Sequence, residues 1–479
     1  MNRDELCYAP ILVLRELLAR RAVSARELVE ALIDRLEEVN PSLNAVVALR
    51  PEAALAEAQS LDRDSSTRGP LAGIPFTIKD LNETADLPTT MGSRAFAGHQ
   101  AGFDAEVVRR LRQAGAILLG KTNTPEFGLR ATTENQLFGT TRNPWNLGYN
   151  PGGSSGGAAA AVAAGISPLA QGSDGGGSIR NPASSCGVVG LKPTRGRVSG
   201  APAAYEAWAG LATDGPLART IRDVALMLDV IAGPVAGEPY GLPQAMPFLA
   251  ACDRRPSKLR LAYTALPAHG QIHSEVKDAL VRVVRTFREM GHEVEEASPD
   301  LTGLRAAFIT IVGGNVGALK KRVPPEKLGD LEPSTVNLML SGHSLTAADY
   351  CEAVNTARTR AAAIMGFWRE YDFLLTPTMT QLPPLLGAMP SSFELDAIWD
   401  EITDLGAFTY PFNVTGQPSL SVPAGWSIEH KLPIGVQIVG EYGSESELLA
   451  LAACYEEAQP WIDRRPQLHP SGMASTTQG

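Results

Sequence analysis

Short apolar runs alternate with longer runs that are amphipathic or rich in alanine over most of this chain. A short apolar run is typical of a buried strand, and a longer periodic run is typical of a helix. The predicted helices are 106–114, 158–164 and 274–290, and the predicted strands are 116–119, 166–170, 259–263, 293–296, 373–375 and 434–439. This alternation favours an α/β fold in which helices cover both faces of a central mixed sheet.

Residues 1–69 predict two helices ahead of this alternation. The second helix begins at Ser24, where Glu27 completes a capping-box pattern, and Asn40-Pro41 is expected to end it. The apolar run Leu71 to Asp80 follows and predicts a buried strand. This strand carries Lys79 near its end.

The chain shows no internal repeat and no clear linker. We therefore interpret residues 1–479 as a single large domain, with its core over residues 70–233. Residues 300–350 have the least regular pattern, and we expect them to form a helical cap over a pocket. The sequence leaves the oligomeric state open, and a homodimer is one arrangement that it allows.

Composition narrows the classes of partner. The formal net charge is −10 and no long Lys/Arg run occurs, which argues against a nucleic-acid partner. The first residues lack the apolar core of a secretion signal, and the small-residue stretch 158–170 is too short to span a membrane. The five cysteines are widely spaced without a CxxC pair, so we expect no disulfide framework and a cytoplasmic location.

Three segments carry candidate chemistry: Lys79, the glycine-serine segment 151–157, and the segment 172–180, which contains three successive glycines before Ser178. A lysine at a strand end commonly extends to the surface. Each glycine-rich segment on its own also fits a flexible surface turn or an anion-binding loop. Neither matches a nucleotide-binding pattern.

The segment 152–156 also reads as G-x-S-x-G, the nucleophile turn of the α/β-hydrolases. That turn requires a strand directly before it. Residues 141–151 are rich in Asn, Pro and Gly, which argues against a strand there.

Taken together, the segments resemble the amidase signature family. The resemblance is dense over residues 70–230 and weaker over 412–423, 432–437 and 460–461. Its motifs are Gly73-Ile-Pro75, Lys79-Asp80, Gly120-Lys-Thr-Asn123, Phe138-Gly139, Arg142-Asn-Pro-Trp145, Gly152 to Gly157, Ser173-Asp174, Gly176-Gly-Ser178, Arg180, Pro182, Cys186-Gly187 and Gly190-Leu-Lys-Pro-Thr194.

The resemblance implies a catalytic triad. Ser178 corresponds to the nucleophile that forms an acyl-enzyme, and Ser154 to a bridging serine preceded by a cis peptide bond. Lys79 corresponds to the final proton acceptor. A free lysine has a pKa of about 10.4 and is a poor base at neutral pH, but burial beside apolar residues favours its neutral form.

The glycine run is expected to form an oxyanion hole from the N–H groups of Gly175, Gly176, Gly177 and Ser178. Members of the family often have threonine or another larger residue where Gly175 stands, so we expect a roomier rim here. Asp174 and Arg180 are expected to hold this loop without taking part in catalysis.

We expect no metal and no other cofactor. His269 and His273 lie four residues apart, but no third ligand or HExxH pattern accompanies them. A metal-dependent amidohydrolase is therefore disfavoured.

The resemblance places Phe127, Gly128 and Leu129 on the acyl side of the substrate site, and residues 300–345 are expected on the leaving-group side. This apolar lining favours small hydrophobic or aromatic amides, with carbamates (urethanes) as an extension. The alternative within the family is the glutaminase component of a tRNA-dependent amidotransferase, which works together with a partner protein. A non-catalytic binding protein that keeps the fold is the third hypothesis, and intact Lys79, Ser154 and Ser178 argue against it.

Overall fold

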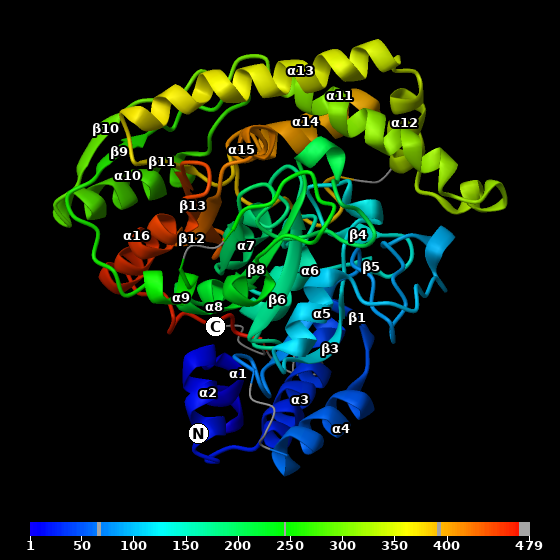
Figure 1. Cartoon of the computed structure of the whole chain (residues 1–479), viewed down its shortest axis with the longest axis vertical. Helices are drawn as coiled ribbons and strands as arrows, with labels where there is room; N and C mark the ends of the chain where they lie inside the picture. The colour runs from blue at the N-terminus through cyan, green and yellow to red at the C-terminus, as the bar shows by residue number, and fades with distance from the viewer. Residues whose placement is uncertain (65–68, 244–245, 390–393, 469–479) are drawn as a thin grey trace, which may run out of the picture.

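An eleven-stranded mixed sheet forms the centre of the computed structural model, which describes residues 1–64, 69–243, 246–389 and 394–468 (Figure 1). The strands lie in the order β1 (Val46–Leu49), β3 (Ile117–Thr122), β2 (Pro75–Lys79), β6 (Leu169–Asp174), β8 (Thr213–Ala218), β7 (Val189–Lys192), β12 (Ser419–Trp426), β13 (Pro433–Gly440), β11 (Phe373–Pro377), β9 (Arg260–Tyr263) and β10 (Glu293–Glu296). Strands β3, β2 and β6 are parallel, as are β11, β9 and β10, and the remaining neighbours are antiparallel. The predicted single α/β domain with a mixed sheet is confirmed.

Successive strand residues point to opposite faces of the sheet and enter different parts of the core. Leu375 and Ile438 pack into one hydrophobic cluster, whereas their neighbours Leu374 and Val439 pack into another. The first cluster receives helices α5 (Glu106–Gln113), α8 (Ile221–Ile231), α10 (Ser274–Glu289) and α16 (Glu445–Ala458). The second receives α11 (Leu304–Gly317), α13 (Ala347–Ile364) and α15 (Tyr410–Thr415). Both faces are therefore covered by helices.

Strand β6 differs from its predicted position and so determines where the nucleophile candidate lies. The expected strand was 166–170, but the strand spans Leu169–Asp174. Its last four residues, Gln171 to Asp174, are poor strand formers by composition, and pairing with β8 holds them extended. As a consequence, Ser178 follows the end of a central strand by only four residues.

The helix α6 (Gly156–Ala163) is buried along its whole length. It begins directly after the segment 151–155 and packs against β6, β2 and α7 (Arg180–Cys186). Only glycine, alanine and valine occur in α6, which allows the close approach of these neighbours. The two glycine-serine segments are therefore anchored on adjacent buried helices.

Two expectations for the N-terminal residues are wrong. The first predicted helix is two helices, α1 (Arg3–Tyr8) and α2 (Ile11–Ala19), because Pro10 has no N–H to continue the first. Helix α3 (Ala25–Leu43) begins at the predicted Ser24 cap but runs past Pro41 to Leu43. Pro41 lies in the last turn, and the carbonyl that it leaves unpaired belongs to the exposed Glu37, where water can bind it.

The residues expected to form a cap lie at one end of the molecule. Helices α11, α12 (Pro333–His343) and α13 pack on one another, and they appear at the top of Figure 1, opposite α1 to α4 at the bottom. The other elements are α4 (Pro51–Arg63), α9 (Phe248–Ala251), α14 (Leu395–Leu405) and the two-stranded β4 (Glu134–Asn135) and β5 (Gly139–Thr140). Over the described ranges, no helix combines the length and the apolar composition that crossing a membrane requires.

Candidate active site

Lys79 lies at the end of β2 with its side chain completely buried. Its Nζ donates hydrogen bonds to Ser154 Oγ at 2.7 Å and to Ser173 Oγ at 3.0 Å. A longer contact of 3.4 Å reaches the carbonyl oxygen of Ser173. The lysine does not extend to the surface, and the oxygens that its amine contacts are all neutral.

Burial lowers the pKa of Lys79 to about 7, against the opposing charges of Asp214 and Asp174, which raise it. An amine with this pKa is largely neutral at mildly alkaline pH and can accept a proton. The backbone of Lys79 is also fixed, because its N–H donates to Gln171 Oε1 at 3.1 Å.

Ser154 is buried in the loop that leads into α6, and the peptide bond between Gly153 and Ser154 is cis. Thr133 holds this loop from the outside. Its Oγ1 donates to the Gly152 carbonyl at 2.7 Å and accepts the Gly156 N–H at 3.1 Å. The Ser154 hydroxyl is therefore presented to Lys79 from a fixed backbone.

Ser178 is half-buried, and its backbone is tied to the same region. Its carbonyl accepts the Ser155 N–H at 3.1 Å. Among the residues that the structure describes, no hydrogen bond joins the hydroxyls of Ser154 and Ser178. Both residues line one cavity, and Lys79 contacts that cavity's wall through Ser154 and Ser173.

The loop before Ser178 is held by a buried ion pair between Asp174 and Arg180. Asp174 also accepts the N–H groups of Gly177 at 2.7 Å and Ile179 at 3.0 Å. Burial by itself would raise the pKa of the Asp174 carboxyl, but the Arg180 charge and these hydrogen bonds hold it below its usual range. Asp174 and Arg180 thus shape the loop, in agreement with the sequence-based expectation.

Arg180 connects this loop to the C-terminal part of the chain. Its guanidinium donates to Asn413 Oδ1 at 2.6 Å, to Gln437 Oε1 at 2.7 Å and to the Thr409 carbonyl at 2.9 Å. Sequence reasoning assigned no role to these three residues. Asn413 and Gln437 lie in the weaker C-terminal resemblance, which was the only signal for them.

The glycine run shows which N–H groups are available to an oxyanion. The Gly177 N–H is already donated to Asp174, so it does not belong with the other three expected donors. Within the described part of the chain, the N–H groups of Gly175, Gly176 and Ser178 have no hydrogen-bond acceptor. Gly177 has a φ of 126°, a conformation that favours glycine, and this accounts for a glycine at that position.

Asp214 on β8 is a further carboxylate beside the lysine that sequence reasoning missed. It accepts hydrogen bonds from Asn82 Nδ2 and Gln171 Nε2, both at 2.9 Å. Burial raises the pKa of Asp214 to about 6, against these hydrogen bonds and the Lys79 charge, which lower it. Neither Asp214 nor Gln171 lies in a recognisable motif, since only the pairing of β6 with β8 brings them together.

Two hollows meet at Ser178. The larger cavity has a volume of about 260 Å³, and Ser154, Ser173, Asp214 and Phe127 are among its lining residues. The other is a narrow pocket of about 30 Å³. Its apolar lining comprises Leu129, Ala131, Trp208, Phe308, Val312, Leu338, Trp399 and Ile402.

The three residues expected on the acyl side are divided between these hollows. Phe127 lines the larger cavity, Leu129 lines the narrow pocket, and Gly128 lines both. Residues of the segment 300–345 were expected on the opposite side from Leu129. Instead, Phe308 and Val312 of α11 share the narrow pocket with it, because α11 packs across that end of the site.

Arg130 lines the narrow pocket as well, but its charge is compensated. Its Nη2 lies 2.6 Å from Glu401 Oε2 in a buried ion pair. A second hydrogen bond joins Arg130 Nε to the same oxygen at 3.0 Å. The pocket therefore does not present an uncompensated positive charge to a substrate carboxylate.

The comparisons with known proteins agree with this fold and site. The model of the family described as Amidase matches residues 27–449. The chain therefore belongs to the amidase signature family, whose members are hydrolases acting on amide C–N bonds.

Within the family, several relatives are similar over their whole length. The 6-aminohexanoate-cyclic-dimer hydrolase of Paenarthrobacter ureafaciens is 38% identical over 95% of each chain. The acylamidase of Rhodococcus erythropolis is 37% identical over 94% of this chain and 95% of its own. A solved structure of 6-aminohexanoate cyclic dimer hydrolase with substrate is 36% identical and covers 96% of this chain and 99% of its own, with a TM-score of 0.91.

The amidotransferase branch is less similar. The glutaminase-type component of the glutamyl-tRNA(Gln) amidotransferase of Thermotoga maritima is 28% identical, with a TM-score of 0.79, over 97% of each chain. The sequence-based placement of this chain nearer the small-molecule amidases than the amidotransferase branch is confirmed.

Proposed function

We propose that this protein hydrolyses hydrophobic or aromatic amides, and aryl carbamates, through an acyl-enzyme on Ser178. The observation that carries the proposal is the hydrogen bond of 2.7 Å between Lys79 Nζ and Ser154 Oγ. It joins a buried amine with a pKa of about 7 to a hydroxyl that lines the same cavity as Ser178. This is an arrangement for moving a proton away from a serine nucleophile at near-neutral pH.

In the first half of the reaction, Ser178 Oγ attacks the carbonyl carbon and its proton passes to Ser154, whose own proton passes to Lys79. The carbonyl oxygen becomes negative, and the N–H groups of Gly175, Gly176 and Ser178 can donate to it. Ser154 then returns a proton to the leaving nitrogen and recovers one from Lys79. The C–N bond breaks, the amine departs, and the acyl group remains on Ser178.

In the second half, water attacks the acyl-enzyme and gives its proton to Ser154 and Lys79 in the same way. The C–O bond to Ser178 breaks, and the Ser178 oxygen takes the proton back. The carboxylic acid leaves, and the three residues are restored. No proton is gained or lost by the chain over the cycle.

The substrate class is supported by the lining of the narrow pocket, which is apolar apart from the paired Arg130 and Asn181. A glutamine specialist must bind an ammonium and a carboxylate, and such charges require dedicated partners. Carbamates enter the proposal because attack on their carbonyl produces the same kind of oxyanion. The names of the relatives, a cyclic-dimer hydrolase and an acylamidase, point to small amides as well.

We further propose that the enzyme works in the cytoplasm on small molecules, without nucleic acid, metal or other cofactor. Its net charge of −10 disfavours nucleic acid, and its five cysteines are unpaired. A homodimer is compatible with the mechanism, because every residue of the proposed triad comes from one chain.

The test is a comparison of kcat/KM for an acyl anilide, an aryl carbamate and free glutamine with the purified single chain. We expect the anilide and the carbamate to be hydrolysed far faster than glutamine. A preference for glutamine would overturn the proposal and favour the glutaminase component of an amidotransferase.

A further inference from the structure

The indole of Trp208 lies where the two hollows of the site meet. Trp208 lines both the larger cavity and the narrow pocket, a property that it shares with Gly128 and Ser178. Gly128 has no side chain and Ser178 is the nucleophile candidate. Trp208 is therefore the large side chain that separates the two hollows at the point of attack.

The position of the indole also accounts for the unusual Gly175. A Cβ placed on Gly175 would lie 2.5 Å from Cζ3 and 2.8 Å from Cε3 of Trp208, closer than real Cβ contacts. A larger residue at position 175 therefore cannot coexist with the indole where it stands. The sequence-based expectation was a roomier rim, but the space left by Gly175 is filled by Trp208.

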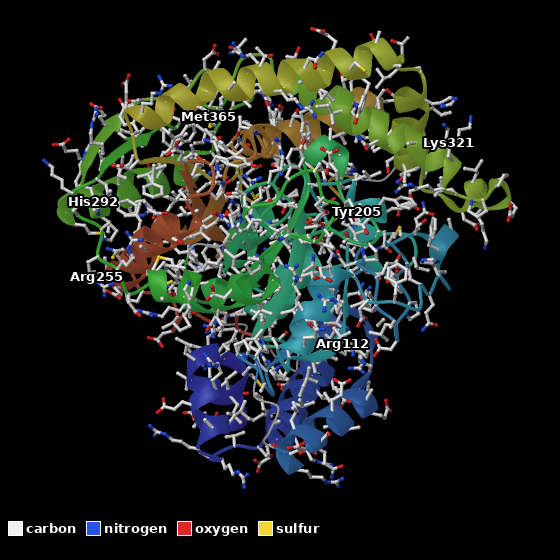
Figure 2. The ribbon with its side chains drawn as sticks, viewed as in Figure 1. Arg112, Tyr205, Arg255, His292, Lys321 and Met365 are labelled. Carbon is white, nitrogen blue, oxygen red and sulfur yellow. The ribbon has the colours of Figure 1, made fainter. Side chains whose placement is uncertain are left out.

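The backbone that presents Trp208 is specifically held. Trp208 and Ala209 both have positive φ values, 53° and 52°, which are uncommon for residues with side chains. Arg195 fixes the end of this turn, because its Nε donates to the Gly210 carbonyl at 2.6 Å and its Nη2 to the Asn413 carbonyl at 2.9 Å. Tyr205 of the same loop is labelled in Figure 2 and shows where the loop lies, between the core and the helices of residues 304–364.

The proton path assigns the two parts of a substrate to the two hollows. The leaving nitrogen must receive its proton from Ser154, and Ser154 and Ser173 line only the larger cavity. The amine part therefore belongs in the cavity of about 260 Å³. The acyl part is left with the narrow pocket of about 30 Å³ beside Leu129 and Phe308.

We propose that Trp208 is a specificity-determining residue that confines the acyl group to the narrow pocket. Preferred substrates then combine a short acyl group with a large amine, such as acetanilides or methyl carbamates of aryl amines. This inference rests on the proposed function, since it assigns the two sides of the amide from the Ser154 proton path.

The experiment measures kcat/KM for 4-nitroanilides of acetic, butyric, hexanoic and benzoic acids. In the wild type we expect the hexanoyl and benzoyl compounds to be at least about tenfold poorer than the acetyl compound, a usual range for pocket-size discrimination. Trp208→Ala should raise the hexanoyl-to-acetyl ratio by about tenfold, and Trp208→Phe should give an intermediate ratio. Trp426→Ala, which removes an indole packed against Arg464 on a different part of the surface, should leave the ratio unchanged.

Labelling by a small fluorophosphonate shows whether each variant still has a folded site, and Trp208→Phe provides the result if Trp208→Ala does not fold. A wild type that cleaves these anilides, with an acyl-length ratio that neither Trp208 variant moves, overturns the role of Trp208 and leaves the proposed function standing. A wild type that cleaves none of the anilides or carbamates overturns the proposed function and this inference with it. A ratio that moves equally in Trp426→Ala also contradicts the inference, because a general loosening of the fold would then explain it.

Discussion

The carboxylate of Asp174 receives both the Nε and the Nη2 of Arg180, at 3.0 and 2.9 Å, and neither side chain is exposed to solvent. The pair lies directly under the loop that carries Ser178. Because Arg180 also binds Asn413 and Gln437, this contact joins the central strand β6 to the C-terminal part of the fold. The geometry of the nucleophile loop thus depends on residues more than 200 positions away.

Arg180→Ala should destabilise the fold by about 3–5 kcal/mol, because it leaves the Asp174 carboxylate buried without its partner. Urea unfolding followed by fluorescence measures this free energy. Arg255→Ala is the matched control, since Arg255 makes an exposed ion pair with Glu457 and is labelled at the periphery in Figure 2. Its loss should change stability by less than about 1 kcal/mol. Equal effects of the two substitutions would contradict the structural role of Arg180.

Ser178→Ala should abolish hydrolysis of every amide substrate and also labelling by a fluorophosphonate, while the far-UV circular dichroism stays unchanged. The reason is that Ser178 Oγ is the proposed site of acyl attachment. Ser257→Ala, at an exposed position outside the helices and strands, is the control and should keep full activity and labelling. Turnover by Ser178→Ala near the wild-type rate would refute the assignment of the nucleophile.

The activity of the wild type should rise with pH through about 7, because the Lys79 amine must be neutral to accept a proton and burial lowers its pKa to about 7. Lys79→Ala should lose several orders of magnitude in kcat at every pH. A pH profile of kcat/KM from about 5 to about 10, taken in steps of about half a unit, checks both expectations. A wild-type profile that falls on going from neutral to mildly alkaline pH would argue against a lysine base.

Asp214→Asn should move the acid limb of this profile to lower pH. The Asp214 charge raises the pKa of Lys79, so its removal makes the protonated amine less favourable. The asparagine can still accept one hydrogen bond from Gln171 or Asn82, which keeps the local geometry close to that of the wild type. Asp278→Asn, on the surface helix α10, is the control and should leave the profile in place. An unmoved acid limb in Asp214→Asn would show that Asp214 acts only on the structure.

Dialysis against a chelator should leave the activity unchanged, because the proposed proton path uses only Lys79, Ser154 and Ser178. Restoration of lost activity by zinc would show a metal-dependent reaction and exclude the serine mechanism. The control is a second dialysis without chelator, which corrects for slow inactivation.

Local rules were enough to predict several features directly from the amino-acid order. The capping box at Ser24, the buried strand ending at Lys79 and the glycine run before Ser178 each follow from neighbouring residues, and the structure has the cap and the strand where they were expected. Resemblance to a family added the partners of these residues as a set, but it could not say how far apart their atoms lie.

Other features depend on how distant segments pack. Strand β12 was not predicted, and it occupies the centre of the sheet between β7 and β13 although its sequence contains proline and glycine. The contacts of Asp214 with Gln171, and of Trp208 with Gly175, join residues about 30 to 40 positions apart on separate segments. Leu129 and Phe308 share a pocket across a much longer separation. Short-range periodicity and capping depend on a few adjacent residues, whereas these contacts depend on which strands pair and which helices pack over them, and that order is settled only when the whole core is assembled.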